Sequence, residues 1–388
     1  MIRVVHLISA LDVGGAERQL CCLAKRSDRR TFHHSVVSMT SIGPAGVEMV
    51  ANGVEVSCLS MTRGVPSPLG LFRLVSLLSR TRPQVLHCWM YHASLLGLVA
   101  GKLVAVPRIV WGIRCSDLDF RHYRYLTRLV VGLGAPLSRH VDVIVPNSER
   151  GKKVHISRGY DGRRMVVIPN GIDPELFRPD EAARASVRRE LGLSENVILV
   201  GLIARFDAMK DHETFFKAAG LLIRRLPGVH FLLAGAGVSI ENAPLARMVC
   251  KNGLNGAVHL VGPRDDVARL TAALDLGTSA SVGEGFCNAI GEAMSCGVPC
   301  VATNVGDSAP IVGNLGRVVP PRDAYALADA WASLLGMPEK DRRALGAAAR
   351  ERIASLFDLQ QATRKYEELY LRISGIVAER RQRNVPLR

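Results

Sequence analysis

Short apolar runs alternate with longer amphipathic stretches through the first 170 or so residues of the chain. Apolar runs of about four to eight residues, bounded by turn residues, are typical of buried strands. We place such strands at residues 4–9, 35–39, 54–59, 85–87, 108–111 and 141–146. Apolar positions at helical spacing predict helices over residues 16–26, 46–52, 69–80 and 92–104. This alternation indicates a parallel sheet with helices on both faces.

A second series of the same kind begins near residue 196. Its predicted strands are residues 197–203, 229–234, 258–260, 275–278, 298–302 and 316–319. A turn-rich segment at residues 168–173 and a charged helix within residues 174–190 separate the two series. The fold class is therefore α/β, with two doubly wound Rossmann-like domains facing each other across a cleft at the carboxyl ends of their sheets.

We place the first domain at residues 1–172, the second at residues 173–356, and a C-terminal helix with a basic tail at residues 357–388. Apolar residues at helical spacing in this last segment predict that the helix packs back on the body of the protein. A length of 388 residues suits two domains of roughly 150–200 residues each, and an apolar content of 48% allows large cores.

The formal net charge of +15 narrows the choice of partners. A basic chain can bind nucleic acid, an anionic membrane or a phosphorylated substrate, or can simply have a basic surface. The sequence has no zinc-finger spacing and no aromatic-basic RNA-binding signature, so we expect no nucleic acid partner. The charge therefore leaves phosphorylated substrates, anionic lipid and a merely basic surface as alternatives.

Several features predict a cytoplasmic protein. The apolar N-terminal run is short and leads directly into Gly14 and Gly15, which is typical of a core strand and not of a signal peptide. The sequence contains no uninterrupted run of about 20 apolar residues, so we expect no membrane span. Nine cysteines occur without a CxxC pair or a histidine cluster, so we expect buried thiols in a reducing compartment and no zinc site.

The richest chemical motif lies at residues 281–303, where a strand, a glycine-bracketed loop, a helix and another strand follow in order. Gly283 and Gly285 allow the backbone to approach a ligand without a Cβ clash. We predict the helix over residues 286–296, ended by Gly297 in a left-handed conformation. The start of this helix offers an anion the backbone N–H groups of Phe286, Cys287 and Asn288.

Two acidic residues, Glu284 and Glu292, flank this helix start. Each carboxylate can accept two hydroxyl hydrogen bonds, so the pair can hold a polyol beside a bound anion. The alternative is two solvated glutamates beside an ordinary helix.

A second motif follows a predicted strand at residues 201–212 and precedes a predicted helix over residues 214–225. Its loop carries Arg205 and Lys210. A diphosphate that is removed from water needs cations, and charge-assisted hydrogen bonds from Arg and Lys provide them. The alternative is a pair of surface cations.

These motifs resemble those of the retaining GT-B glycosyltransferases of family 4. Residues 284–292 resemble the family's glutamate–seven residues–glutamate motif, and the segment at residues 201–212 resembles its G-R-x-x-x-x-K-G segment. Smaller matches extend the resemblance from residue 4 to about residue 370. Departures in the second domain include Cys287 where Pro is usual, Cys300 where Val is usual, and Asp211 where Gly is usual.

The resemblance implies a hexosyltransferase that moves a sugar from a nucleotide diphosphate sugar, with UDP as the expected nucleotide, and retains the anomeric configuration. Glu284 would bind hydroxyls of the transferred sugar, and Glu292 would hold the ribose. Arg205 and Lys210 would bind the leaving diphosphate without a metal or other cofactor. The remaining donor-binding residues that it implies are Gly14, Gly15, Gly262, Arg264, Gly285, Phe286, Cys287 and Asn288.

One departure affects the first domain, where Arg114 stands at the position of a histidine that many relatives carry. An arginine can donate hydrogen bonds to the leaving group but cannot act as a base. His92 is a second candidate for contact with the sugar or acceptor, unless it is a structural histidine, and His87 is expected to face the core. The string Asp117-Leu118-Asp119 resembles a metal-binding motif of a different glycosyltransferase fold, and we regard it as coincidental.

The acceptor is inferred from the segment at residues 120–139, which mixes arginines with aromatic and aliphatic residues. Such a surface can lie on anionic lipid, although an ordinary solvated helix would have a similar composition. We therefore expect a glycan or lipid-linked acceptor, at the inner face of the plasma membrane, in the synthesis of a cell-surface polysaccharide or glycolipid. The alternatives are a nucleotide-sugar epimerase and a non-catalytic sugar-nucleotide-binding protein of the same fold, while the missing G-x-G-x-x-G disfavours a dehydrogenase.

Overall fold

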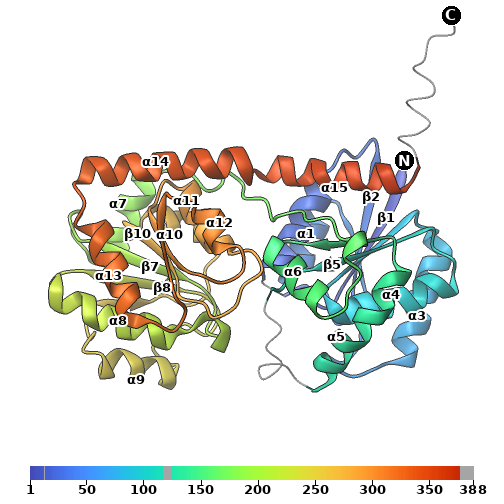
Figure 1. Ribbon diagram of the computed structural model, residues 1–388, viewed down its shortest axis with the longest axis horizontal. Helices are drawn as coiled ribbons and strands as arrows, with labels where there is room; N and C mark the ends of the chain where they lie inside the picture. Colours follow the sequence, from blue (N-terminus) through green and yellow to red (C-terminus); the bar gives the residue numbers. More distant parts are fainter. Residues whose placement is uncertain (13, 117–124, 376–388) are drawn as a thin grey trace, which may run out of the picture. The chain divides into compact units, whose positions relative to one another are not determined.

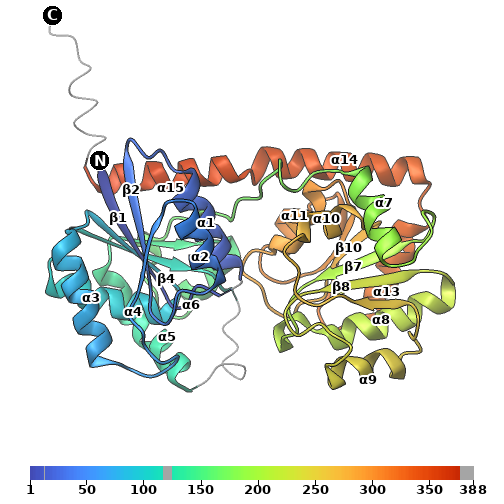
Figure 2. The same cartoon turned by 180° about the vertical axis from the view of Figure 1, so that it is seen from behind.

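The computed structural model describes residues 1–12, 14–116 and 125–375. The chain divides into two compact units, the first made of residues 1–171 and the C-terminal segment from residue 360, the second of residues 172–359. Each unit has a parallel sheet with helices on both faces (Figures 1 and 2). The Asp117–Asp119 string, residues 120–124 of the predicted basic surface and the predicted basic tail lie outside the described residues.

The first unit contains a six-stranded sheet in the order β3-β2-β1-β4-β5-β6, which reverses direction of winding between β1 and β4. Its strands are β1 (Ile2–Ile8), β2 (Phe32–Ser38), β3 (Glu55–Cys58), β4 (Val85–Trp89), β5 (Arg108–Ile113) and β6 (Val143–Pro146). Its helices are α1 (Gly15–Arg26), α2 (Pro44–Ala51), α3 (Pro68–Thr81), α4 (Tyr91–Leu103), α5 (Tyr125–Leu137) and α6 (Glu149–Ser157).

The second unit repeats this plan in the order β12-β11-β10-β7-β8-β9. Its strands are β7 (Leu199–Ile203), β8 (His230–Ala234), β9 (Val258–Leu260), β10 (Leu276–Ser279), β11 (Cys300–Thr303) and β12 (Gly316–Val319). Its helices are α7 (Glu181–Glu190), α8 (His212–Arg225), α9 (Ala243–Lys251), α10 (Val267–Ala272), α11 (Asn288–Ser295), α12 (Ser308–Val312), α13 (Ala324–Leu335) and α14 (Glu339–Leu356). The prediction of two doubly wound α/β domains is confirmed.

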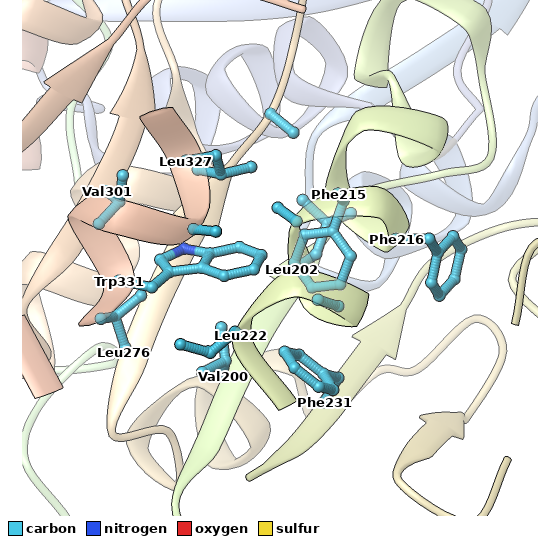
Figure 3. Packing of buried hydrophobic residues seen from close by; sticks show 14 of the residues in the cluster. Val200, Leu202, Phe215, Phe216, Leu222, Phe231, Leu276, Val301, Leu327 and Trp331 are labelled. Carbon is cyan, nitrogen blue, oxygen red and sulfur yellow. The ribbon is translucent and has the colours of Figure 1, made fainter. Parts of the chain in front are cut away.

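Aromatic packing holds helix α8 on the second sheet (Figure 3). The ring of Phe215 from α8 lies 5.2 Å from Trp331 of α13 and 6.0 Å from Phe231 of β8, and all three side chains are buried. Trp331 also donates its indole N–H to Thr278 of β10 at 3.0 Å. Burying one such ring contributes about 1.5–3 kcal/mol, so this cluster fixes the helix that directly follows Lys210.

The last helix, α15 (Leu359–Ile373), returns the chain to the first unit. Its residues Tyr366, Leu369 and Tyr370 are buried against the first sheet. The hydroxyl of Tyr370 lies 2.7 Å from Nδ1 of His87, which is fully buried, as expected. The predicted C-terminal helix that packs back on the body is confirmed.

Candidate functional site

The loop after β10 carries Glu284 at the carboxyl end of the second sheet. Ser281 donates its hydroxyl to Oε1 of Glu284 at 2.7 Å. Thr303, at the end of β11, donates in turn to the carbonyl oxygen of Ser281 at 2.6 Å. Only 12% of the Glu284 side chain is exposed. Two neighbouring strands therefore orient this carboxylate.

Lys210 lies in the loop after β7, which ends in a short 3₁₀ helix at Ala208–Lys210. Its ammonium group forms an ion pair with Oε1 of Glu284. The two loops are also joined through their backbones, because Val282 donates its N–H to the Met209 carbonyl at 2.9 Å. Burial lowers the pKa of Lys210, but the Glu284 carboxylate outweighs this effect and the net shift is upward. Lys210 is therefore a cation at neutral pH.

Arg205 begins the same loop, and 56% of its side chain is exposed. Its Nε lies 3.4 Å from a carboxylate oxygen of Asp207. The positive charge of Arg205 lowers the pKa of Lys210, against the net upward shift. The two cations are therefore close enough to interact electrostatically. Two cations beside a single deeply placed carboxylate can accept an anionic group of higher charge, such as a diphosphate.

Asp211 stands where the family motif described above has a glycine, and its backbone conformation is one that glycine adopts easily. Its φ of 46° lies in the left-handed region, where glycine has no steric penalty. Asp211 also caps α8, because it accepts hydrogen bonds from the Thr214 N–H at 3.2 Å and the Thr214 hydroxyl at 2.7 Å. Aspartate tolerates this conformation better than most residues, and the cap offsets its cost.

The Arg205 loop rests on a glycine-containing loop after β8 that the sequence interpretation missed. A Cβ at Gly235 would lie 2.3 Å from the Ala204 carbonyl oxygen and 2.7 Å from the Arg205 nitrogen. Gly235 donates its N–H to Gly262 at 2.8 Å, and Gly262 has a left-handed φ of 72°. The signal for this loop was the Gly-Ala-Gly string directly after a predicted strand.

The back of the Glu284 loop is held by a second loop that the interpretation missed, which follows β11. Asp307 donates its N–H to the Gly285 carbonyl at 3.1 Å. A Cβ at Gly306 would lie 2.5 Å from the carbonyl oxygen of Glu284, and its φ is 56°. Glycine is therefore required here for the two loops to approach.

Helix α11 begins at Asn288, two residues later than predicted. The ring of Phe286 is buried and packs edge-on against Phe357 at 5.4 Å. The Asn288 N–H donates to the Phe286 carbonyl at 3.1 Å. Burial raises the pKa of the Cys287 thiol to about 11, which keeps it neutral. Glu292 lies on the buried face of α11 with 7% of its surface exposed.

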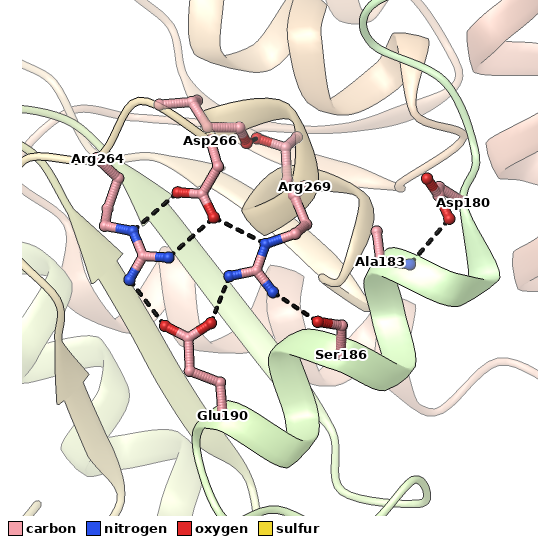
Figure 4. Close-up of polar contacts among 9 residues, drawn as sticks. Asp180, Ala183, Ser186, Glu190, Arg264, Asp266 and Arg269 are labelled. Carbon is pink, nitrogen blue, oxygen red and sulfur yellow. Dashed lines mark hydrogen bonds and ion pairs between the residues drawn. The ribbon is translucent and has the colours of Figure 1, made fainter.

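Figure 4 shows Arg264 between two carboxylates, those of Asp266 and Glu190. Its guanidinium donates twice to Asp266, at 2.8 Å each, and once to Glu190 at 2.7 Å. Arg269 binds the same two carboxylates. These hydrogen bonds raise the pKa of Arg264 and tie the loop after β9 to α7. A donor phosphate would have to displace two carboxylates to reach this guanidinium.

In the first unit, Gly14 and Gly15 follow β1 beside the point where the strand order reverses. Gly14 is the residue before α1, and a Cβ there would lie 2.4 Å from a carboxylate oxygen of Glu17. His92 lies in the first turn of α4, and burial lowers its pKa, so its ring is neutral at neutral pH. Met90, directly before α4, has a left-handed φ of 72°, and such strain clusters at functional sites.

Arg114 contacts groups of its own unit. One terminal nitrogen donates to Asn170 at 3.1 Å and the other donates to the Tyr366 hydroxyl at 2.6 Å. The guanidinium also lies over the Trp89 ring, 4.2 Å from its centroid. Asn170 lies just before the chain leaves the first unit, and Tyr366 just after it returns. Arg114 therefore fastens both segments to the end of β5.

Two family models match the chain. The model described as "Glycosyltransferase Family 4" matches residues 13–176, and the model described as "Glycosyl transferases group 1" matches residues 195–337. The fold is similar to that of Anabaena HepE in complex with UDP and glucose, with a TM-score of 0.82 and 22% identity over 95% of this chain and 99% of that one. Sucrose-phosphate synthase from Thermosynechococcus elongatus gives a TM-score of 0.81 at 20% identity, over 96% and 100% of the two chains.

This chain matches two curated relatives over different shares of their length. A D-inositol 3-phosphate glycosyltransferase of Corynebacterium urealyticum is 28% identical over 60% of this chain and 57% of its own length. A UDP-Gal:alpha-D-GlcNAc-diphosphoundecaprenol alpha-1,3-galactosyltransferase of Escherichia coli is 23% identical over 81% of each chain. The chain thus spans little more than half of the first relative.

Proposed function

The chain belongs to family 4 of the GT-B glycosyltransferases, and on that premise we propose that it is a hexosyltransferase that uses a UDP-sugar and retains the anomeric configuration. The observation that carries the proposal is the ion pair of Lys210 with Glu284, beside Arg205, at the carboxyl end of the second sheet. This arrangement joins a site for phosphate charge to a carboxylate that can bind sugar hydroxyls.

In the proposed reaction, the bond between the anomeric carbon and the diphosphate oxygen breaks, and a bond from that carbon to the acceptor oxygen forms on the same face. The departing diphosphate takes the proton of the acceptor hydroxyl. Arg205 and Lys210 stabilise the growing negative charge, which requires neither a metal nor another cofactor from the protein. Glu284 loses its partner Lys210 to the diphosphate and turns to sugar hydroxyls, while Glu292 holds the ribose.

We further propose a glycan or lipid-linked acceptor, with peripheral contact between the first unit and an anionic membrane. Helix α5 exposes Leu126, Leu129 and Leu133, by 41%, 47% and 43%, beside Arg128. The adjacent α4 exposes 66% of Leu103. Apolar side chains among arginines on a chain of net charge +15 favour the surface of a membrane over its interior. None of the helices in the described ranges is long and apolar enough to span a bilayer.

The central test is a panel of UDP-, GDP- and ADP-sugars, scored by thermal stabilisation of the protein. We expect UDP-sugars to stabilise the native protein most, and the Lys210→Ala variant to lose this effect. Transfer from the best donor, with the product anomer assigned by NMR, tests retention. The proposed donor site is refuted if no nucleotide sugar stabilises the protein, or if the sugars stabilise Lys210→Ala as much as the native protein.

Membrane contact is tested separately by flotation with vesicles of anionic or of zwitterionic lipid. We expect flotation with anionic vesicles at low salt, reduced at high salt because screening weakens surface charge. The Leu129→Ser and Leu133→Ser double substitution should reduce flotation without changing UDP binding. Equal flotation with both vesicle types, or none with either, would contradict the membrane proposal.

A further inference from the structure

Four charged side chains join the loop after β9 to helix α7 (Figure 4). Glu190, the last residue of α7, accepts hydrogen bonds from both Arg264 and Arg269. Asp266 accepts hydrogen bonds from the same two arginines at 2.7 or 2.8 Å. Positive and negative groups therefore alternate around a closed ring, with each guanidinium between the two carboxylates.

The charged ring fixes geometry more than it adds stability. Its four side chains are 26–38% exposed, and a single ion pair at such exposure contributes little, whereas bidentate pairs in a network hold a defined arrangement. The arginines lower the pKa of Glu190 and of Asp266, so all four groups are charged at neutral pH. The ring therefore holds the loop after β9 at a set position on α7.

Asp266 forgoes another role in order to bind the arginines. It directly precedes α10, where an aspartate usually accepts a hydrogen bond from a backbone N–H of the first helical turn. Within the described chain, the Asp266 side chain makes no such capping bond to α10. Both of its carboxylate oxygens bind guanidinium groups instead. A local preference that is broken in this way is expected where a side chain serves a function.

The loop after β9 in turn holds the loop after β8. Gly262 stands two residues before Arg264, and both of its backbone groups bind the neighbouring loop. Its N–H donates to the Val238 carbonyl at 2.8 Å, and its carbonyl accepts from the Gly235 N–H at 2.8 Å. A proline with a fixed φ separates Gly262 from Arg264. Because this path has little freedom, a shift of Arg264 would displace Gly262.

The loop after β8 holds the segment that carries Arg205. Phe206, directly after Arg205, donates its N–H to the Ala236 carbonyl at 2.8 Å. The backbone of Ala204 and Arg205 also lies against Gly235, at distances that leave no room for a Cβ. Each loop thus rests on the next one, and the position of Arg205 depends on the charged ring at α7.

We propose that Arg264, Glu190 and Asp266 are positioning residues, which set the cation site of the donor through the loops after β9 and β8 and do not bind the donor themselves. The inference rests on the proposed function and changes the role that the family resemblance implies for Arg264. The two roles predict opposite results. If Arg264 bound the diphosphate, Glu190 would compete with the donor, and removing its charge would strengthen binding. If Arg264 positions the loops, the same change weakens binding.

The Glu190→Gln variant of the full chain separates these roles, with UDP as the probe in titration calorimetry. The amide retains the shape of the side chain but removes one of the two carboxylate charges from the ring. We expect the Kd for UDP to rise by about fivefold, a size typical of substitutions that act on a site from a distance. Hydrogen exchange should become faster at the amides of Gly235 and Gly262 and stay unchanged in α13.

Two further variants serve as control and as second test. Asp329→Asn is the matched control, because it removes a carboxylate from an ion pair with Arg225 elsewhere in the same unit. It should leave the Kd for UDP unchanged. Arg264→Lys keeps the positive charge but lacks the planar fork that binds both carboxylates, so it should weaken UDP binding as Glu190→Gln does. It provides the same test if Glu190→Gln does not fold.

The possible results lead to different conclusions. An unchanged Kd for UDP in Glu190→Gln would overturn the proposal, and a lower Kd would assign Arg264 to the donor itself. An equal rise in Kd in Asp329→Asn would also overturn it, because the effect would then reflect a general loss of stability. Failure of the native protein to bind UDP would instead refute the proposed function.

Discussion

Replacement of Lys210 by methionine tests the central ion pair, because it removes the cation and retains most of the side-chain volume. In the structure, 23% of Lys210 and 12% of Glu284 are exposed. Removing one partner of a buried pair costs about 3–5 kcal/mol. The Ser281 hydroxyl still donates to the carboxylate in the variant. We therefore expect the unfolding free energy to fall by about 3 kcal/mol, the lower end of this range.

The stability of the second unit is measured by hydrogen exchange of amides in α8 and β10, because unfolding of a two-unit protein is not a single transition. Glu284→Gln leaves the opposite charge unpaired and should also be destabilising. The double substitution should cost less than the sum of the two singles by about 1–3 kcal/mol. Turnover in Lys210→Met should fall about 10²–10³-fold if one charge-stabilising contact is lost.

The pH dependence gives an independent check. The pKa of Lys210 is raised in the folded protein, so the pair stabilises the fold fully below the unfolded lysine pKa of about 10.4. This contribution is lost as the pH rises through the pKa of Lys210 in the folded protein. The difference in unfolding free energy between the native protein and Lys210→Met should shrink over the same pH range. Additive effects of the two single substitutions, with a cost below about 0.5 kcal/mol for each, would refute the reasoning.

Three further predictions concern the loops and the histidines. Gly235→Ala should destabilise the second unit by about 2 kcal/mol or more and weaken UDP binding, as measured by hydrogen exchange and calorimetry, because its Cβ would meet the Ala204 carbonyl. Asp211→Ala should cost about 2 kcal/mol in denaturant unfolding, from the lost cap and the left-handed φ, whereas Asp211→Gly should cost about half as much; equal costs would contradict this explanation. Burial lowers the pKa of His34 to about 4, and also lowers that of His6, so both are neutral when folded. The first unit should therefore lose stability as the pH falls from about 6.5 toward 4, seen in hydrogen exchange of β1 and β2, and a flat profile would contradict it.

The strands were predictable because the hydrophobic pattern records burial directly. Both sheets are buried on two faces, and each predicted apolar run contains or overlaps an observed strand. Helix α14 was not predicted, although it has 18 residues, because only Gly346, Ala349 and Ile353 are buried along it. Small residues at a helix–helix contact leave little apolar periodicity in a sequence.

The start of α11 shows the opposite error. Phe286 stands at an apolar position that continues the helical pattern, yet it precedes the helix because its ring packs against Phe357, 71 residues later (357 − 286).

A similar limit applies to the cysteines that were expected to be buried. Five are buried, whereas Cys22, Cys58 and Cys115 are half-buried and Cys250 is exposed. Residue type alone does not say which face of an element is covered.

The sequence alone determined the two α/β units, their strands and the residues that carry charge after each strand, because these properties depend on local composition and spacing. Only the tertiary structure decided which charges are paired. It joins Lys210 to Glu284 across 74 positions, engages Arg264 with two carboxylates, and holds Arg114 between two segments of its own unit. An ion pair depends on the distance between loops from different strands, and no local pattern contains that distance.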